Sequence, residues 1–214
     1  MSTYLVAFVV SDYVNTTNEK GTFRVWTKED AANQAAYALK VGEDVIGTLD
    51  NYTGIKYSNY MPKMDQISIK DFTAGAMENW GLVTYRESAL HYEEGVTTTA
   101  SKQSVATIIA HEFAHQWFGN LVSPKWWEYI WLNEGFANYM QHFIMDKLEP
   151  SWRLMEYYVA DSLQGKAFLF DAGEKTRPMN KAVSSPKEIL ALFDRVAYEK
   201  SGSIIRMMSY ILTP

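Results

Sequence analysis

The sequence contains no cysteine, only 4 histidines and no long apolar run, and each shortage excludes a class of structure. Without cysteine, the 214-residue chain has neither disulfides nor a thiolate metal site, so any metal must be bound by histidine and carboxylate side chains. The longest early apolar run, residues 4–10, is too short to span a bilayer and lacks the basic flank of a signal peptide. The net charge of -5 is mild and no Lys/Arg cluster is present, so no nucleic-acid partner is expected.

What the sequence does contain is ample material for a hydrophobic core. Hydrophobic residues make up 47% of the chain, with 7 Trp, 14 Tyr and 10 Phe. A chain of this composition buries enough apolar surface to fold, which excludes intrinsic disorder. Its length suits one large domain, or one domain and a piece of another.

The first part of the sequence favours strands and one helix. Residues 4–10 are almost all apolar and predict a buried strand, whereas residues 23–26 alternate apolar with polar side chains and predict a second. Small and apolar residues then recur at helical spacing over residues 27–51, with Thr27 as the expected N-cap. Short β-type stretches follow at residues 66–69 and 81–85.

From residue 99 onward the periodicity is helical. An apolar stripe from Val105 to Trp117 predicts a helix that ends at Gly119, and a second stripe predicts a helix from about Leu132 to Leu148. Two helices packed in antiparallel fashion would result, because the connection between them is short.

The last part of the sequence carries further helix signals. Ser185-Pro186-Lys187-Glu188 is a capping box that begins a helix, residues 198–202 predict a break, and residues 204–212 predict the final helix. A strand-containing part followed by a helical part indicates an α+β fold, with a boundary expected near Thr27.

The strongest chemical signal is the segment His111-Glu112-Phe113-Ala114-His115, an HExxH motif in the middle of a predicted helix. Histidines four residues apart lie one turn above each other, about 40° apart around the helix axis, so both imidazoles can reach one ion. Zinc accepts such ligands and leaves a position for water, from which Glu112 can take a proton. The alternative, two unrelated histidines on a helix flank, is improbable in a chain with 4 histidines.

A catalytic zinc site needs a third protein ligand, and Glu134 is the candidate. It follows His115 after 18 intervening residues and lies off the apolar stripe of its helix, so packing does not explain it. Taken alone, Glu134 would be an ordinary acidic residue in the first turn of a helix, where the helix dipole favours it. The HExxH motif on the preceding helix reverses that balance.

These motifs together resemble a known family. The segment Gly75-Ala76-Met77-Glu78-Asn79, the HExxH motif and the glutamate that follows it after 18 intervening residues are similar, in this order and spacing, to the gluzincin aminopeptidases of the aminopeptidase N type. The resemblance covers essentially the whole chain, and residues 126–140 and 197–208 are most similar to insect midgut membrane aminopeptidases.

The resemblance implies a role for each matching residue. His111, His115 and Glu134 would bind one Zn²⁺ ion, and Glu112 would be the general base. Glu78 would bind the free α-ammonium of a peptide substrate, and the backbone of Gly75 and Ala76 would hold its main chain. Tyr198 would stabilise the transition state. Without the resemblance, Glu78 would be an ordinary loop acid and Tyr198 a packed aromatic.

The resemblance also implies an architecture and a location. Residues 1–26 would be the end of an N-terminal β-saddle domain, and residues 27–214 a thermolysin-like zinc peptidase domain that is truncated. The full-length protein would be anchored outside this chain at the extracellular face of the plasma membrane. Two N-x-T sequons, at Asn15 and Asn51, permit such a setting.

The function that follows is a zinc aminopeptidase that removes the N-terminal residue from peptides with a free N-terminus. Two alternatives remain open. A thermolysin-like endopeptidase would share the zinc, the base and the fold but differ at Glu78, and it would cleave free and N-acetylated peptides equally. A cell-surface receptor domain that does not need catalysis would commonly have lost a ligand or the base, whereas here every expected group is present.

Overall fold

The chain has a mixed α+β architecture in two compact units. The computed structural model describes residues 1–174 and 176–212, and the chain divides into a first unit, Met1–Gln116, and a second unit, Trp117–Pro214. Thr213 and Pro214, where the predicted peptidase domain ends, lie outside the described residues. None of the described helices is both long enough and apolar enough to cross a bilayer.

The first unit is built on a five-stranded mixed sheet with the strand order β1-β2-β3-β5-β4. The two outermost pairs, β1 with β2 and β4 with β5, are antiparallel, whereas β2, β3 and β5 are parallel to one another. Strand β4 is therefore an edge of the sheet. The strands are β1 Val14–Thr17, β2 Phe23–Thr27, β3 Met64–Ile69, β4 Ala76–Met77 and β5 Leu82–Arg86.

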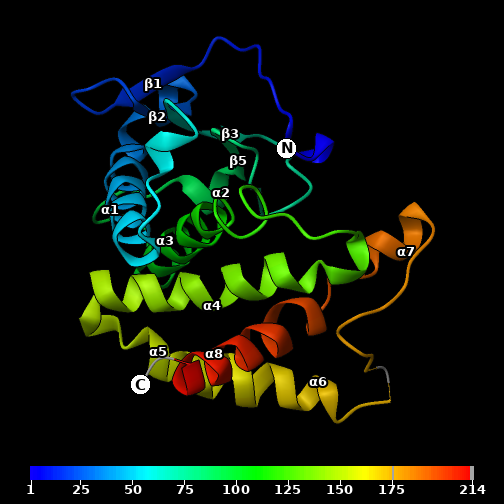
Figure 1. Cartoon of the computed structure of the whole chain (residues 1–214). Helices are drawn as coiled ribbons and strands as arrows, with labels where there is room; N and C mark the ends of the chain where they lie inside the picture. Colours follow the sequence, from blue (N-terminus) through cyan, green and yellow to red (C-terminus); the bar gives the residue numbers. More distant parts are fainter. Residues whose placement is uncertain (175, 213–214) are drawn as a thin grey trace. The chain divides into compact units, whose positions relative to one another are not determined.

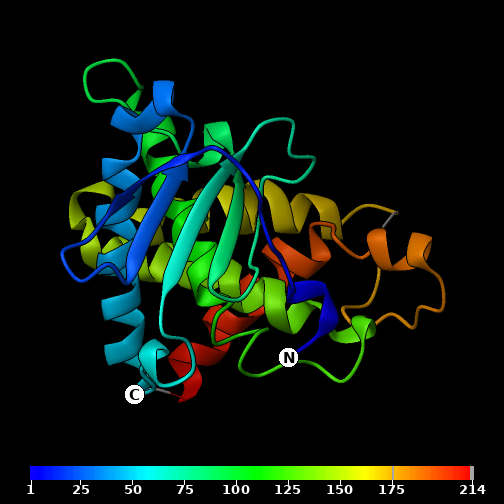
Figure 2. The same ribbon diagram turned by 90° about the horizontal axis from the view of Figure 1, so that it is seen from above.

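Two long helices, α1 and α3, pack together on one face of this sheet (Figure 2). The ring of Phe23 on β2 meets that of Phe113 on α3 edge to face, with centroids 5.8 Å apart. Gly42 on α1 allows this approach, because a Cβ there would lie 2.8 Å from the Phe23 ring. The helical elements of this unit are η1 Thr3–Leu5, η2 Glu29–Gln34, α1 Ala36–Thr53, η3 Tyr57–Asn59, α2 Glu87–Leu90 and α3 Thr99–Ala114.

The second unit is helical, and its long helix α4 packs against η7 and α8 (Figure 1). Helix α5 continues through the π-helical segment η6 into α6 without a break. The elements of this unit are η4 Trp127–Tyr129, α4 Trp131–Leu148, η5 Pro150–Trp152, α5 Leu154–Tyr157, η6 Tyr158–Phe168, α6 Leu169–Asp171, α7 Pro186–Leu190, the π-helical segment η7 Val196–Lys200 and α8 Ser201–Leu212.

Several predicted elements are confirmed. The strands expected at residues 23–26, 66–69 and 81–85 correspond to β2, β3 and β5, and the helix expected from about Leu132 corresponds to α4. The capping box is present, with the Ser185 hydroxyl accepting from the Glu188 backbone N–H and the Glu188 carboxylate accepting from that of Ser185.

The strand predicted at residues 4–10 is wrong. Residues Thr3–Leu5 form a 3-10 turn, no strand follows through residue 10, and Phe8 and Val10 are 86% and 91% exposed. Only Leu5 enters the core. An apolar run forms a strand only where a neighbouring strand pairs with it. The sequence of the run does not show whether such a partner strand exists.

The helix predicted to begin at Thr27 starts later than expected. Thr27 is the last residue of β2, the 3-10 helix Glu29–Gln34 follows, and α1 begins at Ala36. Strands β1 and β2 share one sheet with β3, so residues 14–27 are integral to the first unit. The domain boundary after residue 26 stays a prediction.

Contact between α4 and the beginning of α8 depends on Gly135. A Cβ at this position would lie 2.8 Å from Ser201 Cβ and 3.0 Å from Ile205 Cδ1, closer than packed side chains tolerate. We therefore expect Gly135→Ala to lower the free energy of unfolding by about 1–3 kcal/mol, as overpacking of a core does. Denaturant unfolding measures this change.

The matched control for this substitution is Gly47→Ala on α1, where an added Cβ meets no atom within 4 Å. We expect that variant to be unchanged, or stabilised by about 0.4–1 kcal/mol, because alanine restricts the unfolded chain. Equal effects of the two substitutions would contradict the close packing of α4 on α8.

Candidate active site

The paired histidines lie at the C-terminal end of α3. His111 and Glu112 are in its last turn, and His115 is its C-cap residue. The two Nε2 atoms are 3.1 Å apart, and the rings meet at an interplanar angle of 82°. Two nitrogen ligands of a tetrahedral zinc ion lie roughly 3.3 Å apart, since each Zn–N bond is about 2.0–2.1 Å. The donor set and its spacing therefore fit a zinc ion.

The prediction that this motif occupies the middle of a helix that ends at Gly119 is wrong. Helix α3 ends at Ala114, and a turn follows before Gly119, which has a φ of 134°. The apolar residue Trp117 continues the helical spacing of Phe113 beyond the end of the helix, so periodicity alone overestimates its length. The C-terminal end of a helix carries a partial negative charge, so a site at the end of α3 favours a cation.

Two glutamates accompany His115 in the first unit. One ligand atom from each of Glu78, Glu112 and His115 lies within 4.8 Å of the others. All three residues are buried, with 7%, 6% and 1% of their surface exposed. Buried carboxylates are costly unless they meet cations or donors, so this grouping indicates a site rather than a packing accident.

Glu78 reaches this position from the edge of the sheet. It directly follows β4, whose Ala76 and Met77 pair with Tyr85 and Thr84 of β5. Gly75 precedes the strand and accepts a hydrogen bond from the backbone N–H of Arg86, at 2.9 Å. Because β5 pairs with only one side of β4, the other side is an edge to which an extended peptide can bind.

Sequence reasoning missed Gln116, which connects the two glutamates. Its Nε2 donates to the backbone carbonyls of Glu112, at 3.1 Å, and of Glu78, at 3.3 Å. Gln116 is 2% exposed and therefore holds the segment after β4 against the end of α3. The available signal was a single amide side chain between His115 and the apolar pair Trp117-Phe118.

Asn79 and Tyr85 were also missed. Asn79 accepts from the Thr84 hydroxyl, at 3.0 Å, and donates to the Leu5 carbonyl, so it fixes the turn that follows Glu78. Burial, followed by the negative charge of Glu112, raises the pKa of the Tyr85 hydroxyl well above its ordinary value. Tyr85 therefore stays protonated beside Glu112, and no pattern in the sequence distinguishes it from other strand tyrosines.

The other two predicted residues belong to the second unit. Glu134 lies in the first turn of α4 and is 5% exposed. The side of α4 that lacks the apolar stripe is buried too, through Asn133, Asn138 and His142. Burial of this polar side was not predicted, because amphipathicity assigns polar residues to solvent.

Tyr198 is half-buried within η7, which packs against α4. Its ring packs against a small core of Ile130, Val183, Leu192 and Ala197. The predicted break at residues 198–202 is wrong, because η7 continues directly into α8. Gly202 lies inside α8 and permits a close approach, since a Cβ there would lie 2.7 Å from Asn138 Oδ1.

Comparison with known proteins identifies the family. Residues 37–214 match the Peptidase family M1 domain. Aminopeptidase N from Plutella xylostella is 45% identical to the chain over 219 residues, which cover 100% of this chain and 23% of that protein. Aminopeptidase M1 from Arabidopsis thaliana is 44% identical over 99% of this chain and 24% of that protein. Aminopeptidase N from Bos taurus is 42% identical over 100% of this chain and 23% of that protein.

The chain thus spans about a quarter of the length of these relatives. The match of the family domain extends over most of the chain and includes the segment 75–79, the HExxH motif and Glu134. The resemblance to aminopeptidase N-type metallopeptidases is confirmed, and the chain belongs to peptidase family M1.

Proposed function

We propose that this chain carries the active site of a zinc aminopeptidase, which hydrolyses the N-terminal residue from peptides. The observation that carries this proposal is the buried grouping of Glu78 and Glu112 with His115. It places a carboxylate suited to a substrate ammonium beside a carboxylate suited to proton transfer and a histidine suited to a metal. The aminopeptidase names of the relatives agree with it.

His111, His115 and Glu134 are the proposed ligands of one Zn²⁺ ion. The Nε2 spacing of 3.1 Å supports the first two, and Glu134 would complete the set from the second unit. When bound, zinc supplies a Lewis acid for the scissile carbonyl and lowers the pKa of a water molecule that serves as the nucleophile. Two neutral imidazoles and a carboxylate are a ligand set that catalytic zinc uses in peptidases.

Glu112 and Tyr198 are the proposed catalytic residues. The carboxylate of Glu112 accepts a proton from the attacking water and then donates it to the leaving amine. The hydroxyl of Tyr198 donates a hydrogen bond to the carbonyl oxygen as that oxygen becomes negative, which stabilises the transition state. The thermolysin-like arrangement of the domain belongs to the same proposal.

Glu78, Gly75 and Ala76 would bind the substrate. The Glu78 carboxylate pairs with the free α-ammonium, and the edge of β4 that does not face β5 pairs with the peptide main chain. An ammonium paired with Glu78, whose carboxylate is grouped with Glu112 and His115, lets the first peptide bond reach the site and excludes interior bonds. The reaction therefore removes one residue in each cycle.

A comparison of two substrates tests this proposal. The intact zinc-loaded protein that carries this chain is given an aminoacyl chromophore with a free amino group and the same compound after N-acetylation. We expect hydrolysis of the free compound alone, because the acetylated one has no charge for Glu78. Equal cleavage of both would establish an endopeptidase, and cleavage of neither with zinc bound would favour a receptor domain.

We further propose that the full-length protein acts at the extracellular face of the plasma membrane, with its anchor outside this chain. The sequon residues Asn15 and Asn51 are both exposed, so each is open to N-glycosylation. Treatment of the cell-derived protein with an N-glycosidase tests this location: a loss of mass supports it, and an unchanged mass counts against glycosylation at either residue.

A further inference from the structure

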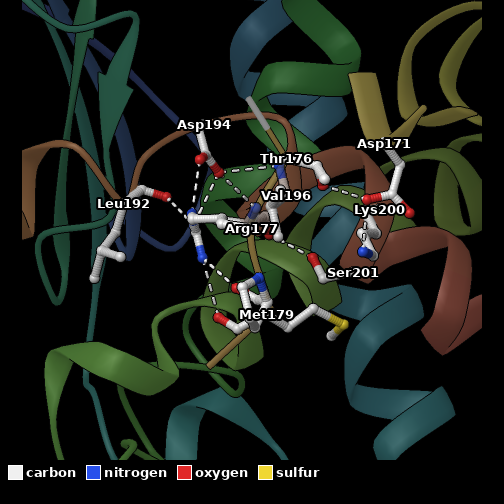
Figure 3. A network of polar contacts seen from close by, with 11 residues as sticks. Asp171, Thr176, Arg177, Met179, Leu192, Asp194, Val196, Lys200 and Ser201 are labelled. Carbon is white, nitrogen blue, oxygen red and sulfur yellow. Dashed lines mark hydrogen bonds and ion pairs between the residues drawn. The ribbon is translucent and has the colours of Figure 1, made fainter. Parts of the chain in front are cut away.

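The Arg177 side chain of the second unit is only 10% exposed and uses all of its hydrogen-bond donors (Figure 3). Its Nε and Nη2 each donate to the Asp194 carboxylate at 2.8 Å. Nη2 also donates to the Leu192 carbonyl at 2.9 Å, and Nη1 donates to the carbonyls of Pro178 and Met179 at 2.9 and 3.1 Å. These bonds satisfy the five N–H groups of a guanidinium, and lysine could not reproduce them.

Asp194 connects Arg177 to the segment that carries Tyr198. Its Oδ1 accepts from the backbone N–H groups of Val196 and Ala197, at 3.0 and 3.1 Å. Its own carbonyl accepts from the backbone N–H of Tyr198, at 3.2 Å. Asp194 therefore caps the turn in which Tyr198 lies, much as an N-cap residue satisfies the first donors of a helix.

A second contact holds the other side of Tyr198. Lys200 donates to Asp171 Oδ1 at 2.7 Å, and the Thr176 hydroxyl donates to the same oxygen (Figure 3). Thr176 is the neighbour of Arg177 in the chain, so residues 176–177 are tied to positions on both sides of Tyr198. The segment between these ties is confined.

The segment η7 needs these contacts because it is π-helical. The π-helix is rare and occurs mostly as single turns within α-helices, frequently at functional sites. Contacts from outside the turn must then select this backbone over the ordinary α-helix. The ion pair of Arg177 with Asp194 is mostly shielded, with side chains 10% and 25% exposed, so water screens it little.

We propose that Arg177 and Asp194 are positioning residues, which hold the Tyr198 hydroxyl where it donates to the reacting carbonyl oxygen. This inference rests on the catalytic role proposed for Tyr198. The printed hydrogen bonds join Arg177 to Asp194 and to the carbonyls of Pro178, Met179 and Leu192, none of which is a proposed zinc or substrate ligand. Its substitution should therefore act on the turnover step rather than on zinc or substrate binding.

A double-mutant cycle in the intact zinc-loaded protein tests the proposal. We expect Arg177→Lys to lower kcat about 10- to 100-fold, since a displacement near 1 Å at a reacting group costs up to about 10²-fold. KM and zinc content should stay within about twofold. The affinity for a phosphinic peptide that mimics the tetrahedral transition state should fall with kcat, because only that species uses the Tyr198 donor.

In a Tyr198→Phe background, Arg177→Lys should change kcat less than about twofold, because no hydroxyl remains to be positioned. Equal losses in both backgrounds would overturn the positioning role and leave Arg177 a structural residue. Tyr198→Phe with unchanged kcat would instead refute the catalytic role of Tyr198, and with it this inference. The Tyr198→Phe variant alone therefore distinguishes a failure of the catalytic role of Tyr198 from a failure of the positioning role of Arg177.

Two further variants guard the interpretation. Asp194→Asn keeps an oxygen for the backbone N–H groups but weakens the ion pair, so it provides the same test if Arg177→Lys does not fold. Arg153→Lys alters the pair of Arg153 with Glu156 on the same unit, whose side chains are 70% and 66% exposed. We expect that control to leave kcat unchanged, since exposed pairs contribute little.

Discussion

Replacing Glu112 with glutamine is expected to reduce hydrolysis of an aminoacyl chromophore at least about 10²-fold while one zinc ion stays bound. A general base contributes about 10²–10⁴-fold, and an amide cannot accept the proton of the attacking water. The substitution keeps the shape of the side chain and the backbone carbonyl to which Gln116 donates. Parallel measurement of kcat and of zinc content per chain tests it.

The matched control is Glu94→Gln, at an exposed position in the loop before α3. That variant loses one carboxylate in the same way but is expected to keep full activity. Should Glu112→Gln retain the activity of the control, Glu112 would not be the base, and the mechanism would need another proton acceptor.

Replacing Glu78 with glutamine is expected to lower kcat/KM for substrates with a free amino terminus by roughly 10²-fold, because loss of one partner of a buried charge pair costs about 2–5 kcal/mol. The ratio between free and N-acetylated substrates should fall by a similar factor, since the acetylated substrate never makes the pair. Zinc content should not change. Kinetics with both substrates provide the ratio.

Glu87→Gln serves as the control for this substitution, since Glu87 is a carboxylate of the same unit whose partner is Lys28 at a half-exposed position. It should leave the substrate ratio unchanged. If Glu78→Gln reduced cleavage of both substrates equally, the carboxylate would support the site in general, and selection of chain ends would come from elsewhere.

The sequence predicted the local geometry of the site well because that geometry follows from helical spacing. Two histidines four residues apart share one side of a helix wherever the helix lies in the fold, and their Nε2 atoms are indeed 3.1 Å apart. The capping box at Ser185 is equally local, since its hydrogen bonds join residues three apart. Neither depends on distant parts of the chain.

Features that depend on distant residues were not predictable. The apolar residues 4–10 are indistinguishable in the sequence from a core strand, yet most of them are exposed. The sequence predicted a break at residues 198–202, yet Gly202 lies within α8, where its lack of a side chain admits Asn138 of α4. The clamp of Arg177 on Asp194 joins residues 17 apart through loops and leaves no periodic signal.

Metal removal and restoration test the central claim most directly. The intact protein is stripped with a chelator, and zinc is added back while hydrolysis of free and N-acetylated substrates is followed, with His115→Ala in parallel. The account predicts that the stripped protein is inactive, that activity on the free substrate alone returns and saturates at one zinc per chain, and that His115→Ala does not recover at that stoichiometry. Full activity of the stripped protein, or full recovery by His115→Ala at one zinc per chain, would contradict it.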